Sequence, residues 1–327
     1  MNFHVLLQST LAALLVIPAV APAQQKYPVK PVRVIVPAPA GGNIDEFARV
    51  FCAKLSEILG HQVIIDNRPG AGNTIGAAMA AKAAPDGYTL LVDNMTSHTF
   101  NPALYGKLPF DTERDFTAVR MLVTIPHILV THPSLPAKTM KELIAFAKTH
   151  PGQLNYASYG AGTTSHLAGE LLRIMAHVDI VHVPYKGGPA ALTDTIAGSV
   201  PMYFSGIAIA VAYVRSGRLR APAVLTLARS PLLPEVPTMA EAANLPTFEV
   251  ASRIAMMAPA GTAKDIVAQL GDAAARALRD RDVSQKIAGG GFDIVGDGSA
   301  DGFPAWFAAE REKWVKVIRE AGIRMER

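Results

Sequence analysis

The chain has a single cysteine, no clustered charge and no histidine cluster, and each of these absences excludes a class of protein. Cys52 is the only cysteine among 327 residues, so an intramolecular disulfide is impossible. It falls on the apolar face of a predicted helix, where we interpret it as a small core residue rather than a nucleophile or a ligand. The nine histidines show no metal-ligand spacing, so the sequence predicts no metal site.

Charged residues make up 18% of the chain and form no clustered run. The 31 basic and 27 acidic residues leave a formal net charge of +4, which gives no case for a nucleic-acid partner and agrees with small anionic ligands. The hydrophobic share of 50% is that of an ordinary globular protein, neither disordered nor a bundle of membrane helices. The length is sufficient for two domains.

The opening apolar run, Leu11 to Ala19, is too short to span a bilayer. Ala21-Pro22-Ala23 then precedes Gln24 in the small-x-small pattern of a secretory cleavage site, so we predict that residues 1–23 are a signal peptide that is removed. The residues before the apolar run include no lysine or arginine, so an uncleaved anchor or a misplaced start remains the alternative. No cysteine follows the predicted cleavage site, which argues against a lipoprotein.

Two glycine-rich corners, each between a predicted strand and a predicted helix, organise the rest of the chain. In the first, the β-branched run Val32 to Val36 is typical of a buried strand, and apolar residues at three-four spacing follow as a helix. Asn43 and Glu46 match a capping box, so the helix is expected to begin where the glycines end. Backbone N–H groups are then free at Gly42 to Asp45, where the helix dipole favours an anion.

The second corner has the same construction, with a strand over Leu154 to Ser158, a glycine loop over 159–165 and a helix from His166 onward. Two such corners far apart in the sequence indicate two α/β lobes, each offering one helix N-terminus to a shared cleft. The alternative is that the glycines only permit the tight turn into each helix.

Strands and helices alternate along the chain, which predicts a mostly parallel sheet in each lobe with ligand-facing loops at the carboxyl ends of its strands. Asn94, which follows the third strand, is expected to face the cleft. We place one crossing between lobes near Ile125 and a second over Phe248 to Ala258, as in a hinged cleft. Residues 24–125 and 250–327 then form lobe 1, and residues 126–249 form lobe 2. Further strands are predicted at 63–66, 88–92, 125–131, 180–183, 202–204 and 223–227, and further helices at 74–84, 140–149, 190–197, 263–279, 282–288 and 303–320.

Two glycine pairs, at 70–72 and 160–162, match part of a dinucleotide-binding fingerprint. The third glycine is missing at the required offset in both, so we expect no nucleotide cofactor.

A hydrolase shares some residue types with this sequence. Ser158 and His166, with Asp45 or Asp194, supply the residues of a catalytic triad. The nucleophile elbow, however, needs a glycine where Tyr156 stands. A periplasmic serine hydrolase using Ser158 and His166 is therefore the alternative from another functional class.

Many ordered motifs together resemble one known family. They are Pro39-Ala40-Gly41-Gly42, Asn67-Arg68-Pro69-Gly70-Ala71-Gly72, Pro85-Asp86-Gly87-Tyr88, Ser158-Tyr159-Gly160-Ala161-Gly162-Thr163, His182-Val183-Pro184-Tyr185-Lys186-Gly187 and Ala258-Pro259-Ala260-Gly261-Thr262. Over nearly all of the mature chain the sequence resembles the tripartite tricarboxylate transporter substrate-receptor family, also called the Bug family. The resemblance implies a type II periplasmic binding protein, not an enzyme, that closes over a small carboxylate and delivers it to the membrane permease subunits of such a transporter. We expect a monomer without a cofactor, and a role in signalling rather than transport is the alternative.

Members of this family typically hold the ligand carboxylate between the two glycine corners, partly through ordered water. Carried over to this chain, the resemblance and the predicted corners give one set of expected ligand-binding residues. They are Ala40, Gly41, Gly42, Asn43, Asn94, Ser158, Gly162, Thr163, Thr164, His166 and Ser205.

Three positions depart from the family pattern. Ala38 stands where relatives usually carry an aromatic residue, Ser205 where some carry an aspartate, and Arg253 where a tryptophan is usual. An anionic partner for a ligand ammonium group is then missing, because Asp45 is expected to bind nearby backbone donors. We therefore expect an ammonium-free ligand such as a di- or tricarboxylate or an aromatic acid.

Overall fold

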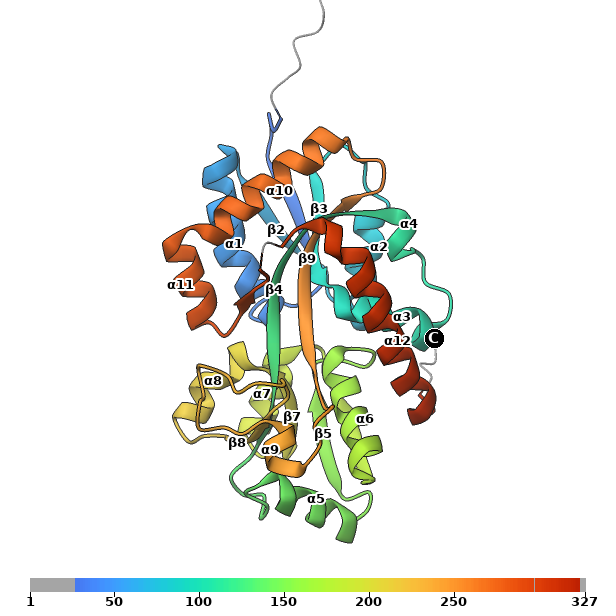
Figure 1. The fold of residues 1–327 in the computed structure, drawn as a ribbon, viewed down its shortest axis with the longest axis vertical. Coiled ribbons are helices and arrows are strands. Elements are labelled where there is room, and N and C mark those ends of the chain that lie inside the picture. Colours follow the sequence, from blue (N-terminus) through green and yellow to red (C-terminus); the bar gives the residue numbers. More distant parts are fainter. Residues whose placement is uncertain (1–26, 297, 324–327) are drawn as a thin grey trace, which may run out of the picture.

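The computed structural model describes residues 27–296 and 298–323. The predicted signal peptide, residues 1–23, lies outside these described residues. Within them, no helix is long and apolar enough to cross a membrane. The molecule is elongated, with two α/β halves stacked along its long axis and joined by two long strands (Figure 1).

The first half is built on three parallel strands, in which β1 lies between β2 and β3. Side chains of β1 pack on both faces of the sheet: Val34 meets a cluster containing Phe47 and Phe51, while Ile35 meets one containing Ala77. Burial on both faces explains the continuous β-branched run. The elements of this half are β1 (Val32–Val36), α1 (Asn43–Leu59), β2 (Val63–Asn67), η1 (Ala71–Asn73), α2 (Thr74–Ala81), β3 (Thr89–Asn94), α3 (Met95–Tyr105), α4 (Thr112–Asp115), α10 (Lys264–Arg279), α11 (Arg281–Gly289) and β10 (Asp293–Ile294).

Two long strands, β4 (Phe116–Thr131) and β9 (Ala251–Pro259), connect the halves. They pair antiparallel from Phe116 to Pro126, and beyond that point β4 pairs with the strands of the second half. Proline at 126 has no N–H to donate, and it lies where β4 changes partners. The prediction that this strand begins at Ile125 was wrong at its start, because polar residues such as Thr117 and Arg120 interrupt the apolar pattern of its first part.

The second half has β5 between β6 and β7 in a parallel set, with β4 antiparallel beside β7. Its elements are α5 (Met140–Thr149), β5 (Leu154–Ser158), α6 (Thr164–Ala176), β6 (Ile180–Pro184), α7 (Gly188–Ile196), β7 (Met202–Gly206), α8 (Ile207–Arg215), β8 (Arg220–Val224) and α9 (Met239–Ala243). The mixed α/β architecture, with helices flanking the sheet, is the predicted one. The sheet itself is mixed rather than mostly parallel, because β4 and β9 pair antiparallel with their neighbours in both halves.

The helix α12 (Phe303–Ala321), after η2 (Ala300–Gly302), packs against α3 of the first half and α6 of the second. Trp314 is fully buried there, with its ring 5.9 Å from that of Phe100. The Arg173 guanidinium of α6 donates to the carbonyl oxygen of Ala321 at 2.9 Å. The last helix of the described chain therefore joins the halves at a third place, beside the two long strands (Figure 1).

Candidate functional site

A cavity of about 50 Å³, which we call the inner cavity, has a wall drawn from both halves of the molecule. The wall is formed by Ala38, Pro39, Gly42, Asn43, Ile44, Asn73, Asn94, Ile125, His127, Tyr159, Gly187, Gly188 and Ser252. None of these residues is a lysine, arginine, aspartate or glutamate. A charged ligand would therefore meet backbone groups and neutral side chains.

The first turn of α1 forms one side of the inner cavity. The helix begins at Asn43, and Gly42 is its N-cap, with an extended backbone and no side chain to satisfy the first N–H groups. The predicted capping box of Asn43 and Glu46 is therefore wrong: Asn43 lies inside the helix and its side chain contributes to the cavity wall instead. The uncapped N–H groups have no intrahelical partner, which suits this corner to an anion.

Asp45 is fully buried but bound by protein donors rather than facing the inner cavity. Its carboxylate accepts from the backbone N–H of Gly41 at 2.9 Å, from Arg49 at 2.7 Å and from Asn67 at 3.0 Å. Burial alone would raise the pKa of Asp45, but these hydrogen bonds outweigh it and hold the pKa below its usual range. As predicted from the sequence, this acid satisfies nearby backbone donors.

The second helix N-terminus at the inner cavity is that of α7. The sequence did not predict this helix as part of the site. Gly187 is its N-cap and Gly188 its first residue, and both are part of the cavity wall. A Cβ at Gly187 would lie 2.3 Å from Pro39, so only glycine allows the two halves to approach this closely. The signal in the sequence was Gly187-Gly188-Pro189, since proline is favoured in the first turn of a helix.

The second glycine-rich corner predicted from the sequence, at the start of α6, lies next to the inner cavity. Thr163 caps α6, whose first residue is Thr164 rather than His166. Thr163 lines a neighbouring space of about 540 Å³, which we call the outer cavity. A Cβ at Gly162 would lie 2.4 Å from the Tyr105 hydroxyl oxygen, so this glycine makes room for a contact between the halves rather than for a ligand in the inner cavity.

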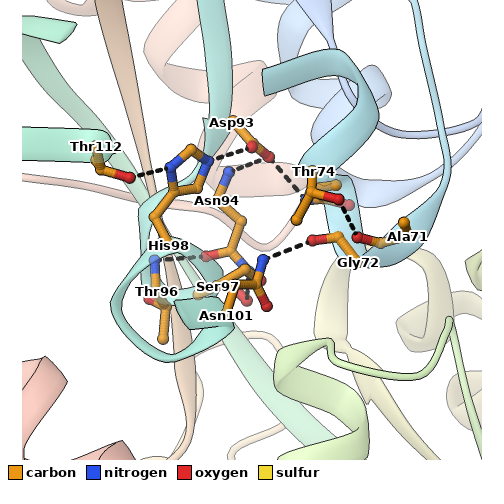
Figure 2. Close-up of polar contacts among 12 residues, drawn as sticks. Ala71, Gly72, Thr74, Asp93, Asn94, Thr96, Ser97, His98, Asn101 and Thr112 are labelled. Atoms are coloured by element: carbon orange, nitrogen blue, oxygen red, sulfur yellow. Dashed lines mark hydrogen bonds and ion pairs between the residues drawn. The ribbon is translucent and has the colours of Figure 1, made fainter. Parts of the chain in front are cut away.

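The end of β3 holds a buried polar network that Figure 2 shows around Asp93 and His98. One oxygen of Asp93 lies 2.7 Å from His98 Nε2, and the other accepts from the Asn73 amide at 2.7 Å and the Asn94 backbone N–H at 2.6 Å. The other nitrogen of His98 lies 2.8 Å from the hydroxyl oxygen of Thr112. Asn73 and Asn94 both line the inner cavity, so this network fixes the side-chain amide of Asn73 and the backbone of Asn94 in its wall.

Asn94 also bridges the two halves of the molecule. Its amide nitrogen lies 2.9 Å from the Thr164 hydroxyl of α6 and 3.1 Å from the Ser252 hydroxyl of β9. Its amide oxygen accepts from the backbone N–H of Thr96 and thereby caps α3. The predicted positions Asn94 and Thr164 are therefore brought together, and their contact depends on the halves lying close.

His127 and Tyr159, on the second-half side, were not predicted as site residues. Burial lowers the pKa of His127 to about 4, so its ring is neutral at pH 7. Nδ1 lies 3.2 Å from the carbonyl oxygen of Ile125, and because a carbonyl only accepts, Nδ1 carries the proton. Nε2 then accepts from the Tyr159 hydroxyl at 3.3 Å. No sequence pattern predicted this pair, because a single histidine in an apolar strand is typical of a buried core residue.

Ser158 and His166 do not form the pair that a hydrolase would need. Ser158 is fully buried and its Oγ lies 2.6 Å from Nε2 of His182, while Nδ1 of His166 accepts from the backbone N–H of Gly162 at 3.3 Å. The rings of His166 and His182 stack at 3.9 Å. Burial, with the charge of His166 second, lowers the pKa of His182 to about 3. Ser158 is not in the wall of either cavity, so the predicted serine–histidine pairing is corrected.

The remaining predicted residues lie around the inner cavity without lining it. Ala40 and Gly41 are exposed at the turn before α1. Ser205 is fully buried and donates to the carbonyl oxygen of Gly206 at 2.9 Å. Of the eleven predicted residues, Gly42, Asn43 and Asn94 line the inner cavity, and Thr163 lines the outer one.

Comparison with known proteins identifies the family and the fold of the chain. The model of the tripartite tricarboxylate transporter family receptor matches residues 47–323. Protein BugT of Bordetella pertussis is 35% identical over 301 residues, which cover 92% of this chain and 92% of that protein. Among solved structures, Rpa4515 of R. palustris with adipate is 34% identical, covers 91% of this chain and 99% of its own, and has a TM-score of 0.87. MatC of Rhodopseudomonas palustris with bound malate is 34% identical and has a TM-score of 0.84. The match covers 89% of this chain and 100% of MatC.

The chain belongs to the tripartite tricarboxylate transporter receptor family, whose Bug proteins include the similar BugT and a periplasmic binding protein, BugD. Its fold is that of the solute-binding receptors of this family, as the motifs in the sequence implied.

Proposed function

We propose that the protein is a periplasmic receptor that captures a small organic carboxylate in the inner cavity and delivers it to the permease of a tripartite tricarboxylate transporter. The observation that carries the proposal is a small cavity, uncharged along its described wall, that borders the N-termini of both α1 and α7. Free N–H groups and two helix dipoles favour an anion without a basic side chain. The adipate and malate bound by the two similar proteins support a carboxylate.

The two lobes of this receptor are residues 24–125 with 250–327, and residues 126–249, moving about β4 and β9. Contacts between the halves, such as that of the Tyr105 hydroxyl with the carbonyl oxygen of Ala161 at 3.0 Å, then form when the cleft closes. The packing of α12 on both α3 and α6 must adjust in the same movement. We further propose that the receptor acts as a monomer, and in transport rather than signalling.

A thermal-shift screen of carboxylates and their esters tests this function. An acid present at about a hundredfold excess over its Kd should stabilise the fold by roughly 2.7 kcal/mol, whereas neutral esters should leave the melting temperature unchanged. Turnover of an ester that disappears in Ser158→Ala would contradict a receptor and favour a hydrolase. Stabilisation by no acid at all would overturn the proposal.

A further inference from the structure

The outer cavity adjoins the inner one. The two share Pro39, Asn73, Tyr159 and Gly187 in their walls. The outer cavity, at about 540 Å³, is much the larger of the two. The two cavities are therefore neighbours, with these four residues in the wall of both.

The inner cavity is too small to hold a whole ligand of more than a few atoms. The 50 Å³ of the inner cavity corresponds to roughly four water positions, enough for one carboxylate and its nearest carbon atoms. The remaining atoms of any longer acid must lie in the outer cavity. The chemistry of that wall then decides which longer acids bind.

Lys186 is the only charged side chain among the described residues of the outer wall. It is exposed, and in the described part of the chain it has no ion-pair partner within 4.0 Å. Its neighbours are held in place: Tyr185 donates from its backbone N–H to Ser158 at 3.0 Å and from its hydroxyl to Asp194 at 2.8 Å. Lys186 is thus an available cation on an anchored segment, directly before the N-cap of α7.

We propose that the outer cavity is a second anion subsite, in which Lys186 binds the distal carboxylate of an elongated diacid whose first carboxylate lies in the inner cavity. The inference rests on the proposed function, and it adds to it a binding residue for the distal carboxylate. The first end is held by backbone groups and the second by a side-chain charge, so the two contributions are separable by mutation.

Titration calorimetry with adipate and hexanoate, two six-carbon acids that differ in the distal carboxylate, tests the inference. Lys186→Met should weaken adipate binding about tenfold, the value of a charge-assisted hydrogen bond, and leave hexanoate binding unchanged. Lys186→Arg should retain most of the adipate affinity, and added salt should weaken adipate more than hexanoate. Lys141→Met, at an exposed lysine of α5 that is in neither cavity wall, is the matched control and should change neither affinity.

Two results would overturn the second subsite while leaving the proposed function intact. One is an adipate affinity that Lys186→Met does not change, and the other is an equal loss for adipate and hexanoate. Absence of binding by any carboxylate to the wild-type protein would instead overturn the proposed function, and the inference with it.

Discussion

Gly42 is the residue at which the backbone of the protein and a ligand carboxylate are expected to meet. Its φ of −84° suits any amino acid, so a side chain there acts through space rather than through backbone strain. A Cβ would lie 3.2 Å from the carbonyl oxygen of Pro39 and would narrow the inner cavity. We expect Gly42→Val to weaken adipate and hexanoate alike, and by more than Lys186→Ala weakens adipate.

Calorimetry on both variants checks this order, and Gly302→Val, where a Cβ meets nothing within 4 Å, is the matched control. The reverse order would move the main anion contact from the backbone to Lys186. Gly162→Val is unsuitable as a test, because its Cβ would strike Tyr105 and its φ of +68° disfavours valine.

Selectivity against amino acids follows from the residues of the inner wall. An ammonium group that loses its hydration needs an anionic partner, and no acid lines the inner cavity in the described structure. We expect aspartate to bind at least about tenfold more weakly than succinate, a difference of about 1.4 kcal/mol. Titration of this matched pair measures it, with Asp45→Asn as the variant that should leave the preference unchanged. Tighter binding of aspartate would show that an acid reaches the ligand.

At the scale of the secondary-structure element, the junction of β3 and α3 depends on the hydrogen bonds of one buried carboxylate, that of Asp93. Asp93→Asn replaces an oxygen that accepts from protein donors with an amide group that itself donates, next to Asn73, Asn94 and His98. We expect the free energy of unfolding to fall by about 1–3 kcal/mol, the cost of one unsatisfied buried donor, and ligand affinity to fall as well.

Urea unfolding and calorimetry on the same preparation measure both quantities. Asp111→Asn, at an exposed cap of the four-residue helix α4, is the comparison that should leave ligand affinity unchanged. Unaltered affinity in Asp93→Asn would mean that Asn73 and Asn94 do not need this network to hold the ligand.

The same elements show what could be predicted from the sequence and what could not. The β-branched run of β1 and the capped helix α5 were found because their patterns are local, and α5 runs from Met140 to Thr149 as predicted. The role of α7 was missed because Gly187 must lack a side chain to lie against Pro39, which is far away in the sequence. Likewise, His127 and Tyr159 were missed because they are joined by a hydrogen bond between residues 32 positions apart, which no sequence periodicity predicts.

For the whole molecule, two buried neutral histidines make stability depend on pH. The pKa is lowered to about 4 for His127 and to about 3 for His182, below the usual 6.5 in both cases. Between pH 6.5 and these lowered pKa values, the unfolded chain binds more protons than the folded one. The stability that the neutral rings contribute above pH 6.5 is therefore lost as the pH falls through about 4 for His127 and about 3 for His182. We expect the free energy of unfolding to drop by about 2 kcal/mol per histidine between pH 6.5 and 4.5.

Urea unfolding at several pH values measures how the free energy of unfolding changes with pH. His182→Gln should reduce this change by the contribution of one histidine. A wild-type stability that stays constant over this range would mean that neither ring is kept neutral by the fold.

The position of β9 has a consequence for the order in which the chain can fold. In the sheet β9 lies between β3 and β4, although it follows β4 in the sequence by more than a hundred residues. The sheet of the first half therefore cannot close until residues 251–259 have been synthesised, whereas strands β5, β6 and β7 pair within one continuous stretch. Contacts between distant residues form slowly because a long loop must close first. The second half should thus gain its structure first, and the first half should acquire its native sheet only when nearly the whole chain is available.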